Sequence, residues 1–341
     1  MKIIVDAMSG DYAPDAVVAG ALDALARIGV DILLCGRTEE ILSAAEKLGT
    51  KVLPPAIEIA NASEVIEMDD DPTNAVRSKK DSSMTVALNL LRDGAGDAMV
   101  SAGNTGALMT GATLIAKRVR GIKRAAIATL VPNSAGGFLL IDTGANAQCT
   151  AEYLLQFAYM GSYYAQDMLN IDSPRIGLLN IGTEPTKGTQ LQLEAFALLE
   201  MARQEGRLNF LGNTEAKDVM YGACDVLVCD GFTGNVFLKA LEGVSSFLLS
   251  EFKAMYSRNL KTKLSALLVK NDISGIRDKL NPDAVGGSIF LGISKPVIKA
   301  HGSSNARAIS NAIRQAAAAV AADIASRLHE STSAMSIPAE Q

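Results

Sequence analysis

The sequence has no tryptophan, two histidines and four cysteines in 341 residues. The two histidines, His301 and His329, are too few for a metal site built from three imidazoles. The cysteines are scattered, and the odd spacing of Cys224 and Cys229 directs their thiols to opposite faces of an expected strand. Disulfides and a zinc knuckle are therefore not predicted. We predict no metal site and no cofactor, although a carboxylate-bound magnesium ion stays open.

The sequence also lacks a strong net charge and a long apolar run. Its 32 Lys and Arg residues against 37 Asp and Glu residues give a net charge of −5, which provides no general attraction for nucleic acid or anionic lipid. No apolar run approaches the ~18 residues of a transmembrane helix, and residues 2–6 begin directly as a strand rather than as a signal peptide. We predict a cytoplasmic protein without a nucleic-acid partner.

Short β-rich apolar runs alternate with amphipathic helical stretches for almost the whole length of the chain. Such alternation predicts an α/β fold of three layers, with a mainly parallel sheet covered by helices on both faces. Expected strands include residues 30–36, 97–101, 126–131 and 138–142, and expected helices include 38–48, 83–92 and 306–328. No Gly/Ser/Pro-rich linker interrupts the pattern, so we predict one domain over residues 1–330 and a flexible tail at 331–341.

Residues 243–280 depart from this pattern because they form a long helical stretch in which leucines alternate with lysines and arginines. An apolar helical stripe favours a hairpin packed on the body of the protein or on a second subunit. A basic amphipathic helix is also typical of a contact with a membrane surface or with a partner protein. We therefore expect a helical protrusion here, and the sequence leaves its partner open.

Three segments share one pattern, in which an apolar strand is followed by glycine, asparagine and threonine and then by a helix. They are residues 101–112 (SAGNTGALMTGA), 175–196 (RIGLLNIGTEPTKGTQLQLEAF) and 226–243 (VLVCDGFTGNVFLKALEG). Glycine turns and helix starts present free N–H groups, and ligands gather at strand ends in α/β sheets. The pattern predicts a phosphate-binding cradle. Neither a GxxxxGK[ST] nor a GxGxxG motif is present, so the cradle suits a small anion rather than a nucleotide.

We predict that these turns and a few cations form the site. The predicted phosphate- or substrate-binding residues are Asn104, Thr105, Gly106, Asp142, Asn146, Asn180, Gly182, Gly231, Thr233, Gly234 and Asn235. The predicted catalytic cations are Lys187, Lys239 and His301, and Lys299 is a further candidate cation. Asp142 and Asp230 end apolar strands, where a carboxylate either caps a helix or acts directly on the substrate.

Several stretches together resemble the PlsX family of phosphate acyltransferases. They include IIVDAMSGDYAPDAVV, VSAGNTGALMTG, GLLNIGTEPTKG, CDGFTGNVFLKALEG and VIKAHGSSNARAISNAIRQA, and the resemblance extends over residues 2–328. The sequence departs from the family pattern at Tyr12, where the family usually has histidine. The resemblance implies a fold similar to isocitrate and isopropylmalate dehydrogenases, with two intertwined subdomains that share one large mixed sheet, and a homodimer.

The resemblance also implies the reaction, which is transfer of a fatty acyl group from acyl-carrier protein to inorganic phosphate for phospholipid synthesis. The sequence has neither a GxSxG elbow nor a Cys–His pair, which agrees with direct attack by phosphate on a thioester. A phosphotransacylase that uses acyl-coenzyme A is the main alternative. A decarboxylating dehydrogenase and a non-enzymatic membrane scaffold are further alternatives.

A carrier protein is acidic, so the resemblance implies a basic docking surface. The sequence offers two candidates. Residues 117–124 (KRVRGIKR) place five cations in eight positions, and Arg77, Lys79 and Lys80 form a second cluster. Either cluster could instead be ordinary solvated loop charge. The sequence also leaves open a peripheral contact with a membrane or with a membrane acyltransferase.

Overall fold

The computed structural model describes residues 1–270, 272–273, 275, 286–332 and 335. The strands are β1 Lys2–Asp6, β2 Asp31–Gly36, β3 Ile57–Asn61, β4 Ala98–Ser101, β5 Ala126–Val131, β6 Phe138–Ile141, β7 Ile176–Asn180, β8 Phe210–Glu215, β9 Val226–Val228, β10 Ser288–Leu291 and β11 Val297–Lys299. They form one sheet in the order β3-β2-β1-β4-β11-β10-β5-β6-β9-β7-β8. Seven of the ten neighbouring pairs are parallel, and the antiparallel pairs lie in the centre. The predicted α/β class with a large mixed, mainly parallel sheet is confirmed.

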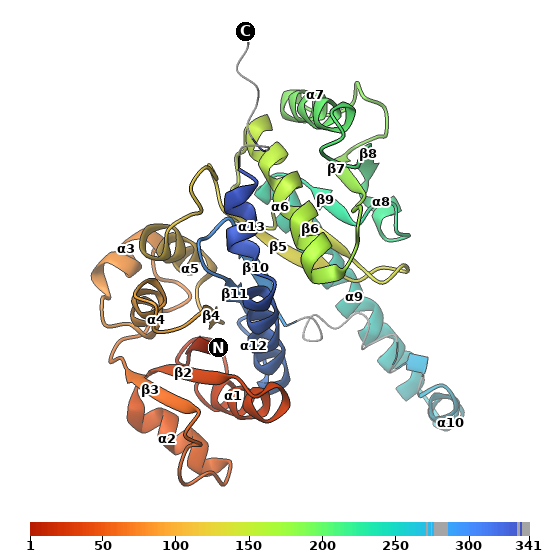
Figure 1. Ribbon diagram of the computed structural model, residues 1–341. Coiled ribbons are helices and arrows are strands. Elements are labelled where there is room, and N and C mark those ends of the chain that lie inside the picture. The colour runs from red at the N-terminus through yellow and green to blue at the C-terminus, as the bar shows by residue number, and fades with distance from the viewer. Residues whose placement is uncertain (271, 274, 276–285, 333–334, 336–341) are drawn as a thin grey trace.

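Helices cover both faces of the sheet (Figure 1). They are α1 Asp15–Ile28, α2 Thr38–Lys47, α3 Pro72–Ser78, α4 Ser83–Arg92, α5 Thr105–Gly111, a π-helix at Ala112–Ala116, α6 Ala151–Leu169, α7 Gln190–Gln204, α8 Ala216–Val219, α9 Gly231–Ser257, α10 Leu260–Leu268, α12 Ala306–Ala321 and α13 Ile324–Glu330. Among the described helices, none is both long enough and apolar enough to cross a bilayer.

Alternation along each strand assigns every second side chain to one face of the sheet. In β1, Ile3 and Val5 pack in the core formed with α1, α6, α7 and α12, whereas Ile4 packs in the core formed with α4 and α5. A third, smaller core lies beneath α8 and α9, where Leu238 packs against a cluster that includes Leu140 and Leu227. The helices α5 and α9 therefore lie over different parts of the sheet and belong to separate cores.

The chain builds one half of the sheet, then the other, and then returns to the first. Residues 2–101 supply β1 to β4, residues 126–228 supply β5 to β9, and β11 comes back to pair with β4. After β11, α12 packs along α1. The return places residues that are about 200 positions apart on adjacent strands, as in the pairing of Lys299 with Ser101.

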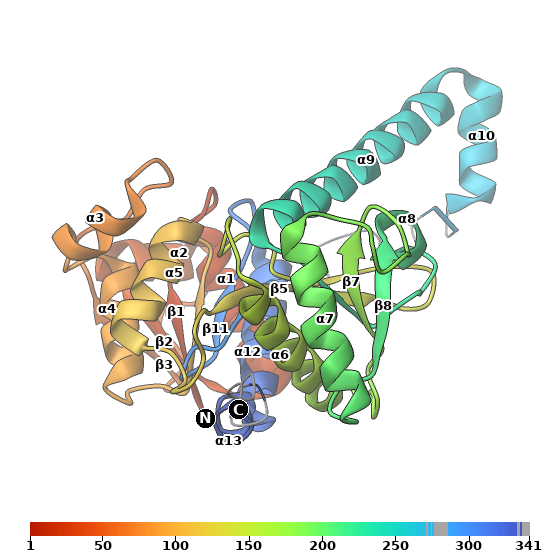
Figure 2. The same cartoon turned by 90° about the horizontal axis from the view of Figure 1, so that it is seen from above.

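The helix α9 begins against the sheet and then projects beyond it, with α10 beside its outer end (Figure 2). Leu260, Leu264 and Leu268 are 84%, 65% and 83% exposed, so the described part of the chain does not cover these leucines of α10. Residues 271, 274 and 276–280 of the expected helical stretch lie outside the described residues, and so does most of the expected tail at 331–341.

Candidate functional site

A cavity of about 460 Å³ lies between α5 and α9, above the centre of the sheet. Its walls come from segments that follow the carboxyl ends of β4, β6, β9 and β11, and from β5 and the start of β10. Its polar lining residues include Thr105, Thr110, Thr129, Thr143, Asn235, Lys239, Glu242, Ser288, Lys299, His301 and Ser304. Strand ends that are far apart in the sequence thus meet at one place, as expected for a ligand site in an α/β protein.

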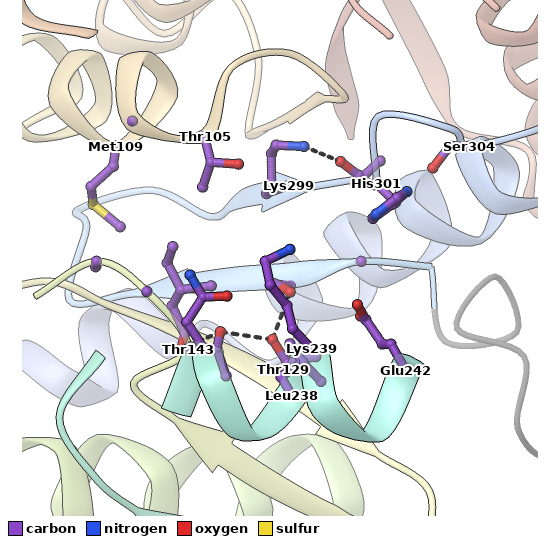
Figure 3. A pocket seen from close by; sticks show the side chains of 18 of the residues that line it. Thr105, Met109, Thr129, Thr143, Leu238, Lys239, Glu242, Lys299, His301 and Ser304 are labelled. Carbon is purple, nitrogen blue, oxygen red and sulfur yellow. Dashed lines mark hydrogen bonds between the residues drawn. The ribbon is translucent and has the colours of Figure 1, made fainter. Parts of the chain in front are cut away.

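Two lysines enter this cavity from different walls. Lys239 extends from the third turn of α9, and Lys299 ends β11 on the opposite wall (Figure 3). Lys239 is exposed to solvent, whereas Lys299 is 9% exposed. Glu242, one turn beyond Lys239, also lines the cavity. The two ammonium groups make this end of the cavity suitable for an anion.

Lys299 is held by backbone carbonyl groups. Its Nζ donates to the carbonyl oxygen of Ala102 at 3.2 Å and to that of Ala300. Burial lowers the pKa of Lys299 to about 8, and the charges of Asp6 and Asp11 act in the opposite direction. A lysine with a perturbed pKa in a cavity is typical of functional sites.

His301 follows β11 and lines the same wall as Lys299. Its Nδ1 lies 2.8 Å from Ser303 Oγ and accepts a 3.2 Å hydrogen bond from the Ser303 N–H. Because Nδ1 accepts, the neutral ring carries its proton on Nε2. The backbone N–H of Ser304 donates to the carbonyl oxygen of His301 at 3.0 Å, which closes this turn before α12.

A row of hydroxyl groups crosses the central strands beside the cavity. Thr129 Oγ1 lies 2.9 Å from Thr143 Oγ1 and 2.7 Å from Ser288 Oγ. Thr143 Oγ1 also donates to the carbonyl oxygen of Ile127 at 3.2 Å. The row joins β5, β10 and the loop after β6, so it ties together the polar segments that line this side of the cavity.

Asp142 lies behind the cavity and organises the loop after β6. Its carboxylate accepts hydrogen bonds from the backbone N–H groups of Ile127, Gly144, Ala145 and Asn146 at 2.7–3.0 Å, and from Asn146 Nδ2 at 2.9 Å. Burial raises the pKa of this carboxyl group, while the hydrogen bonds lower it. The structure therefore gives Asp142 and Asn146 a role in holding the loop, and neither side chain lines the cavity.

The start of α9 uses its polar groups internally. Asp230 caps the helix by accepting from the Thr233 N–H at 2.9 Å and from Thr233 Oγ1 at 2.7 Å. The N–H of Gly231 donates to Asn146 O at 2.8 Å, and the N–H of Gly234 donates to Asp230 O at 2.9 Å. A Cβ atom on Gly234 would lie 1.9 Å from Asp142 O. These glycines permit close packing of α9 on the β6 loop, and their amides are already used.

The start of α5 differs because two of its N–H groups have no partner in the described part of the chain. Asn104 caps the helix by accepting from the Ala107 N–H at 3.0 Å, and its Nδ2 donates to the carbonyl oxygen of Met68 at 3.0 Å. Thr105 and Gly106 line the cavity, and no hydrogen bond is seen for their N–H groups. The structure therefore brings Thr105 and Gly106 of the segment at 101–112 to the cavity, and their role in binding phosphate stays a prediction.

The structure does not bring the third glycine turn to this cavity. Asn180 Nδ2 donates to the carbonyl oxygen of Lys187 at 2.9 Å, which closes the loop after β7 upon itself. Lys187 is exposed, and neither it nor Asn180 nor Gly182 lines the cavity. Their predicted participation in the site stays a prediction.

Sequence reasoning missed Ser304, Thr129 and Ser288, which line the cavity. Ser304 stands in the His-Gly-Ser-Ser turn before α12, so a strand end followed by a helix was the available signal. Among the described residues, no group of three or more His, Cys, Asp or Glu side chains is placed to hold a metal ion. The fold and the cavity together define an α/β protein with a ligand site suited to a small anion.

Comparison with known proteins identifies the family. A family model described as "Fatty acid synthesis protein" matches residues 1–327. The phosphate acyltransferase of Caldanaerobacter subterraneus subsp. tengcongensis is 46% identical over 331 residues, which cover 97% of each chain. The phosphate acyltransferase of Brevibacillus brevis is 47% identical over 326 residues, which cover 95% of each chain. The chain belongs to this family, and the prediction of PlsX membership is confirmed.

Solved structures of lower identity share the fold. A phosphotransacetylase from Streptococcus pyogenes superposes with a TM-score of 0.63 at 18% identity, covering 95% of this chain and 94% of that one. A 4-hydroxythreonine-4-phosphate dehydrogenase from Klebsiella pneumoniae superposes with a TM-score of 0.52 at 12% identity, covering 94% of this chain and 99% of that one. These likenesses concern the architecture alone.

Proposed function

We propose that this protein is an acyltransferase that moves a fatty acyl group from acyl-carrier protein to inorganic phosphate and so supplies acyl phosphate for phospholipid synthesis. The observation that carries the proposal is the cavity between α5 and α9, which Lys239 and Lys299 line from opposite walls. Relatives that match almost the full length are named phosphate acyltransferase, which supports transfer to phosphate.

The reaction requires positioning and charge stabilisation more than acid–base catalysis. An oxygen of phosphate attacks the thioester carbonyl carbon, a C–O bond forms, the C–S bond breaks, and the thiolate leaves. We assign Lys299 to phosphate, Lys239 to the acyl donor, and the N–H groups of Thr105 and Gly106 to the oxyanion that forms at the carbonyl oxygen. Each well-aimed donor contributes about 3 kcal/mol to the transition state. At about 460 Å³, the cavity falls in the range of sites for whole small-molecule ligands, which leaves room beside phosphate for the acyl donor.

The direct test is to incubate the protein with palmitoyl-carrier protein and phosphate, and to trap acyl phosphate with hydroxylamine. A parallel reaction with palmitoyl-coenzyme A tests the alternative donor. Acyl phosphate from the carrier protein alone supports the proposal, and product from the coenzyme A ester alone would make the protein a phosphotransacylase. If neither donor gives product, the proposed function is wrong.

The proposal includes the finer architecture implied by the family resemblance. We propose an isocitrate dehydrogenase-like arrangement of two intertwined subdomains in one domain, in a cytoplasmic homodimer. The return of β11 and α12 to the half of the sheet built by β1 to β4 supports this arrangement. The predicted carrier-protein contact and the peripheral membrane contact belong to the same proposal.

The projecting helices supply an apolar surface for a subunit or membrane contact. We name this surface the α9–α10 face, and its exposed apolar residues are Val244, Phe247, Leu248, Phe252, Met255, Leu260, Leu264, Leu267 and Leu268. Such an exposed apolar stripe favours a contact outside this chain. Sedimentation and liposome flotation of the Leu264→Glu/Leu268→Glu variant distinguish a subunit contact from a membrane contact. Loss of the dimer would identify a second subunit as the partner of this face, and loss of flotation would identify the membrane. No change in either measurement would remove this face from the proposal.

A further inference from the structure

The end of the cavity beside α12 contains two buried polar groups that still have hydrogen-bonding capacity. Lys299 and Ser304 are 9% and 5% exposed, and both line the cavity. Figure 3 shows them with His301 along the wall that follows β11. Buried polar groups are almost always paired, so unused capacity at a cavity wall points to a ligand that completes it.

Ser304 is the clearer of the two cases. Its Oγ is buried and has no hydrogen-bond partner in the described part of the chain. A hydroxyl group both donates and accepts, and leaving it unpaired in the interior costs free energy. Its backbone is fixed, because the Ser304 N–H donates to His301 O and the next residue, Asn305, caps α12. The side chain is thus held in place without a protein partner.

Lys299 has one donor more than its protein partners use. An ammonium group has three N–H donors, and those of Lys299 meet two carbonyl oxygens, of Ala102 and Ala300. The nearby carboxylate of Asp6 is already engaged, since Ser9 Oγ and Ser101 Oγ donate to it at 2.6 and 2.7 Å. The positive charge therefore lacks a directly bonded anion in a buried position, where an unpaired charge is strongly destabilised.

We propose that Lys299 and Ser304 form the subsite that binds inorganic phosphate, with the Lys299 ammonium and the Ser304 hydroxyl donating to its oxygens. This inference rests on the proposed function and assigns the phosphate to the β11–α12 wall, which leaves Lys239 and the α5 amides for the acyl donor and its carbonyl oxygen. The required ligand is a small anion with several oxygens, because an ammonium group and a hydroxyl group on the same wall of the cavity both donate to it.

The charge of this subsite depends on pH. The charges of Asp6 in β1 and of Asp11 in the loop after it act on Lys299. The other titratable groups that line the cavity with Lys299 are Lys239 and Glu242 of α9, and His301 of its own segment. The pKa of Lys299 is about 8, so raising the pH through this value removes the positive charge. Phosphate itself is already dianionic there, so its affinity for the wild-type protein falls as the pH rises.

Steady-state kinetics with palmitoyl-carrier protein and varied phosphate test the assignment. We expect Lys299→Met to raise the KM for phosphate at least about tenfold and Ser304→Ala to raise it about threefold to tenfold, with little change in kcat. The KM of wild type should rise above about pH 8, whereas that of Lys299→Arg should stay flat, because arginine keeps its charge. The KM for the acyl donor should not change.

Lys295→Met is the matched control. Lys295 precedes β11, and its ammonium also donates to a backbone carbonyl, that of Gly96 at 3.0 Å, but at the other end of the strand. The KM of Lys295→Met for phosphate should equal that of wild type. If Lys299→Met does not fold, Ser304→Ala and the pH profile of Lys299→Arg still decide the question.

Other outcomes would overturn the assignment. An unchanged KM for phosphate in folded Lys299→Met and Ser304→Ala would show that phosphate binds elsewhere. A raised KM for the carrier protein alone would show that this wall binds the phosphodiester of the donor. If wild type forms no acyl phosphate, the proposed function fails, but calorimetric titration with phosphate alone still tests the subsite. A binding heat that wild type gives and Lys299→Met does not give supports the subsite. Equal heats in the two proteins overturn the subsite.

Discussion

At the scale of single residues, the buried charge of Lys299, which we assign to ligand binding, lowers the free energy of unfolding. Burial disfavours its charged form, and its pKa of about 8 lies below the 10.5 of a solvated lysine. Between these values the unfolded chain binds a proton that the folded chain does not. The free energy of unfolding therefore increases with pH across this window, by about 1.4 kcal/mol per pH unit for one such group.

We expect wild type to gain up to about 3 kcal/mol of stability relative to Lys299→Met as the pH rises from about 8 to about 10.5. Below the window both states bind the proton, so the difference is constant there. Urea denaturation of the two proteins across this range measures the gain, since other titrating groups are common to both. Parallel stability curves would show that burial does not lower this pKa.

His301 lines the cavity, whereas Lys187 does not, although both are predicted catalytic cations. We expect His301→Ala to lower acyl-phosphate formation at least about tenfold, because the imidazole N–H beside the phosphate subsite is lost. The turnover of purified His301→Ala and Lys187→Ala at saturating substrate measures both roles. An equal loss in Lys187→Ala would bring the loop after β7 into the site, and a normal rate in His301→Ala would exclude its imidazole.

The residues of the site could be predicted only in part, because their neighbours depend on strand order. Lys187 and Lys239 follow glycine turns of the same type, and the sequence treats them alike. The sheet order separates them, since β9 pairs with β6 near the cavity while β7 lies one strand further out. Ser304 could not be singled out, because an unpaired hydroxyl becomes visible only when the packing around it is known.

At the scale of elements, the packing of α9 on the loop after β6 positions Lys239. Gly234 makes this packing possible, since a Cβ atom there would lie 1.9 Å from Asp142 O. We expect Gly234→Ala to destabilise the protein by about 2 kcal/mol or more and to reduce activity, because the helix must move away from the loop. Urea denaturation and turnover measure the two effects.

Gly243 in the same helix provides the control. Nothing lies within 4 Å of a Cβ atom built at this position. Gly243→Ala should therefore stabilise the helix by about 0.5–1 kcal/mol, as alanine does in exposed helix positions, and leave turnover unchanged. Equal stability of Gly234→Ala and wild type would contradict the role given to the close contact.

Most elements could be predicted from local periodicity, and the exceptions have physical reasons. The expected helix at 83–92 matches α4, and the expected strand at 126–131 matches β5. The long expected helix at 306–328 is instead divided into α12 and α13, because Asp323 adopts a left-handed backbone conformation with φ 47°. The strand β3 was missed because its five residues include Glu58 and Asn61 and show a weak apolar pattern.

At the scale of the whole molecule, the two basic clusters lie at different distances from the cavity. Residues 117–124 lie at the end of β10, where the Val119 N–H donates to Gly292 O, whereas the cavity lies at the start of β10. Arg77, Lys79 and Lys80 lie at the end of α3, whose first residue, Pro72, lines the cavity. The second cluster is therefore better placed to receive an acidic carrier protein whose acyl group must reach the cavity.

We expect the Arg77→Glu/Lys80→Glu variant to raise the KM for acyl-carrier protein about fivefold or more, because like charges repel the acidic partner. The KM for phosphate should stay unchanged, since neither side chain lines the cavity. Both side chains are exposed, so the fold should tolerate the reversal. Raising the salt concentration to physiological values should weaken the wild-type interaction and reduce the difference between the two proteins.

The Lys117→Glu/Arg120→Glu variant of the other cluster is the matched control, because it changes the net charge of the protein by the same amount as Arg77→Glu/Lys80→Glu. A general electrostatic effect would raise the KM for the carrier protein equally in both variants. A larger effect at Lys117 and Arg120 would instead place docking at the far end of β10 and contradict the assignment to α3. An effect confined to Arg77 and Lys80 would place the carrier protein beside α3, on the rim from which the thioester can enter the cavity.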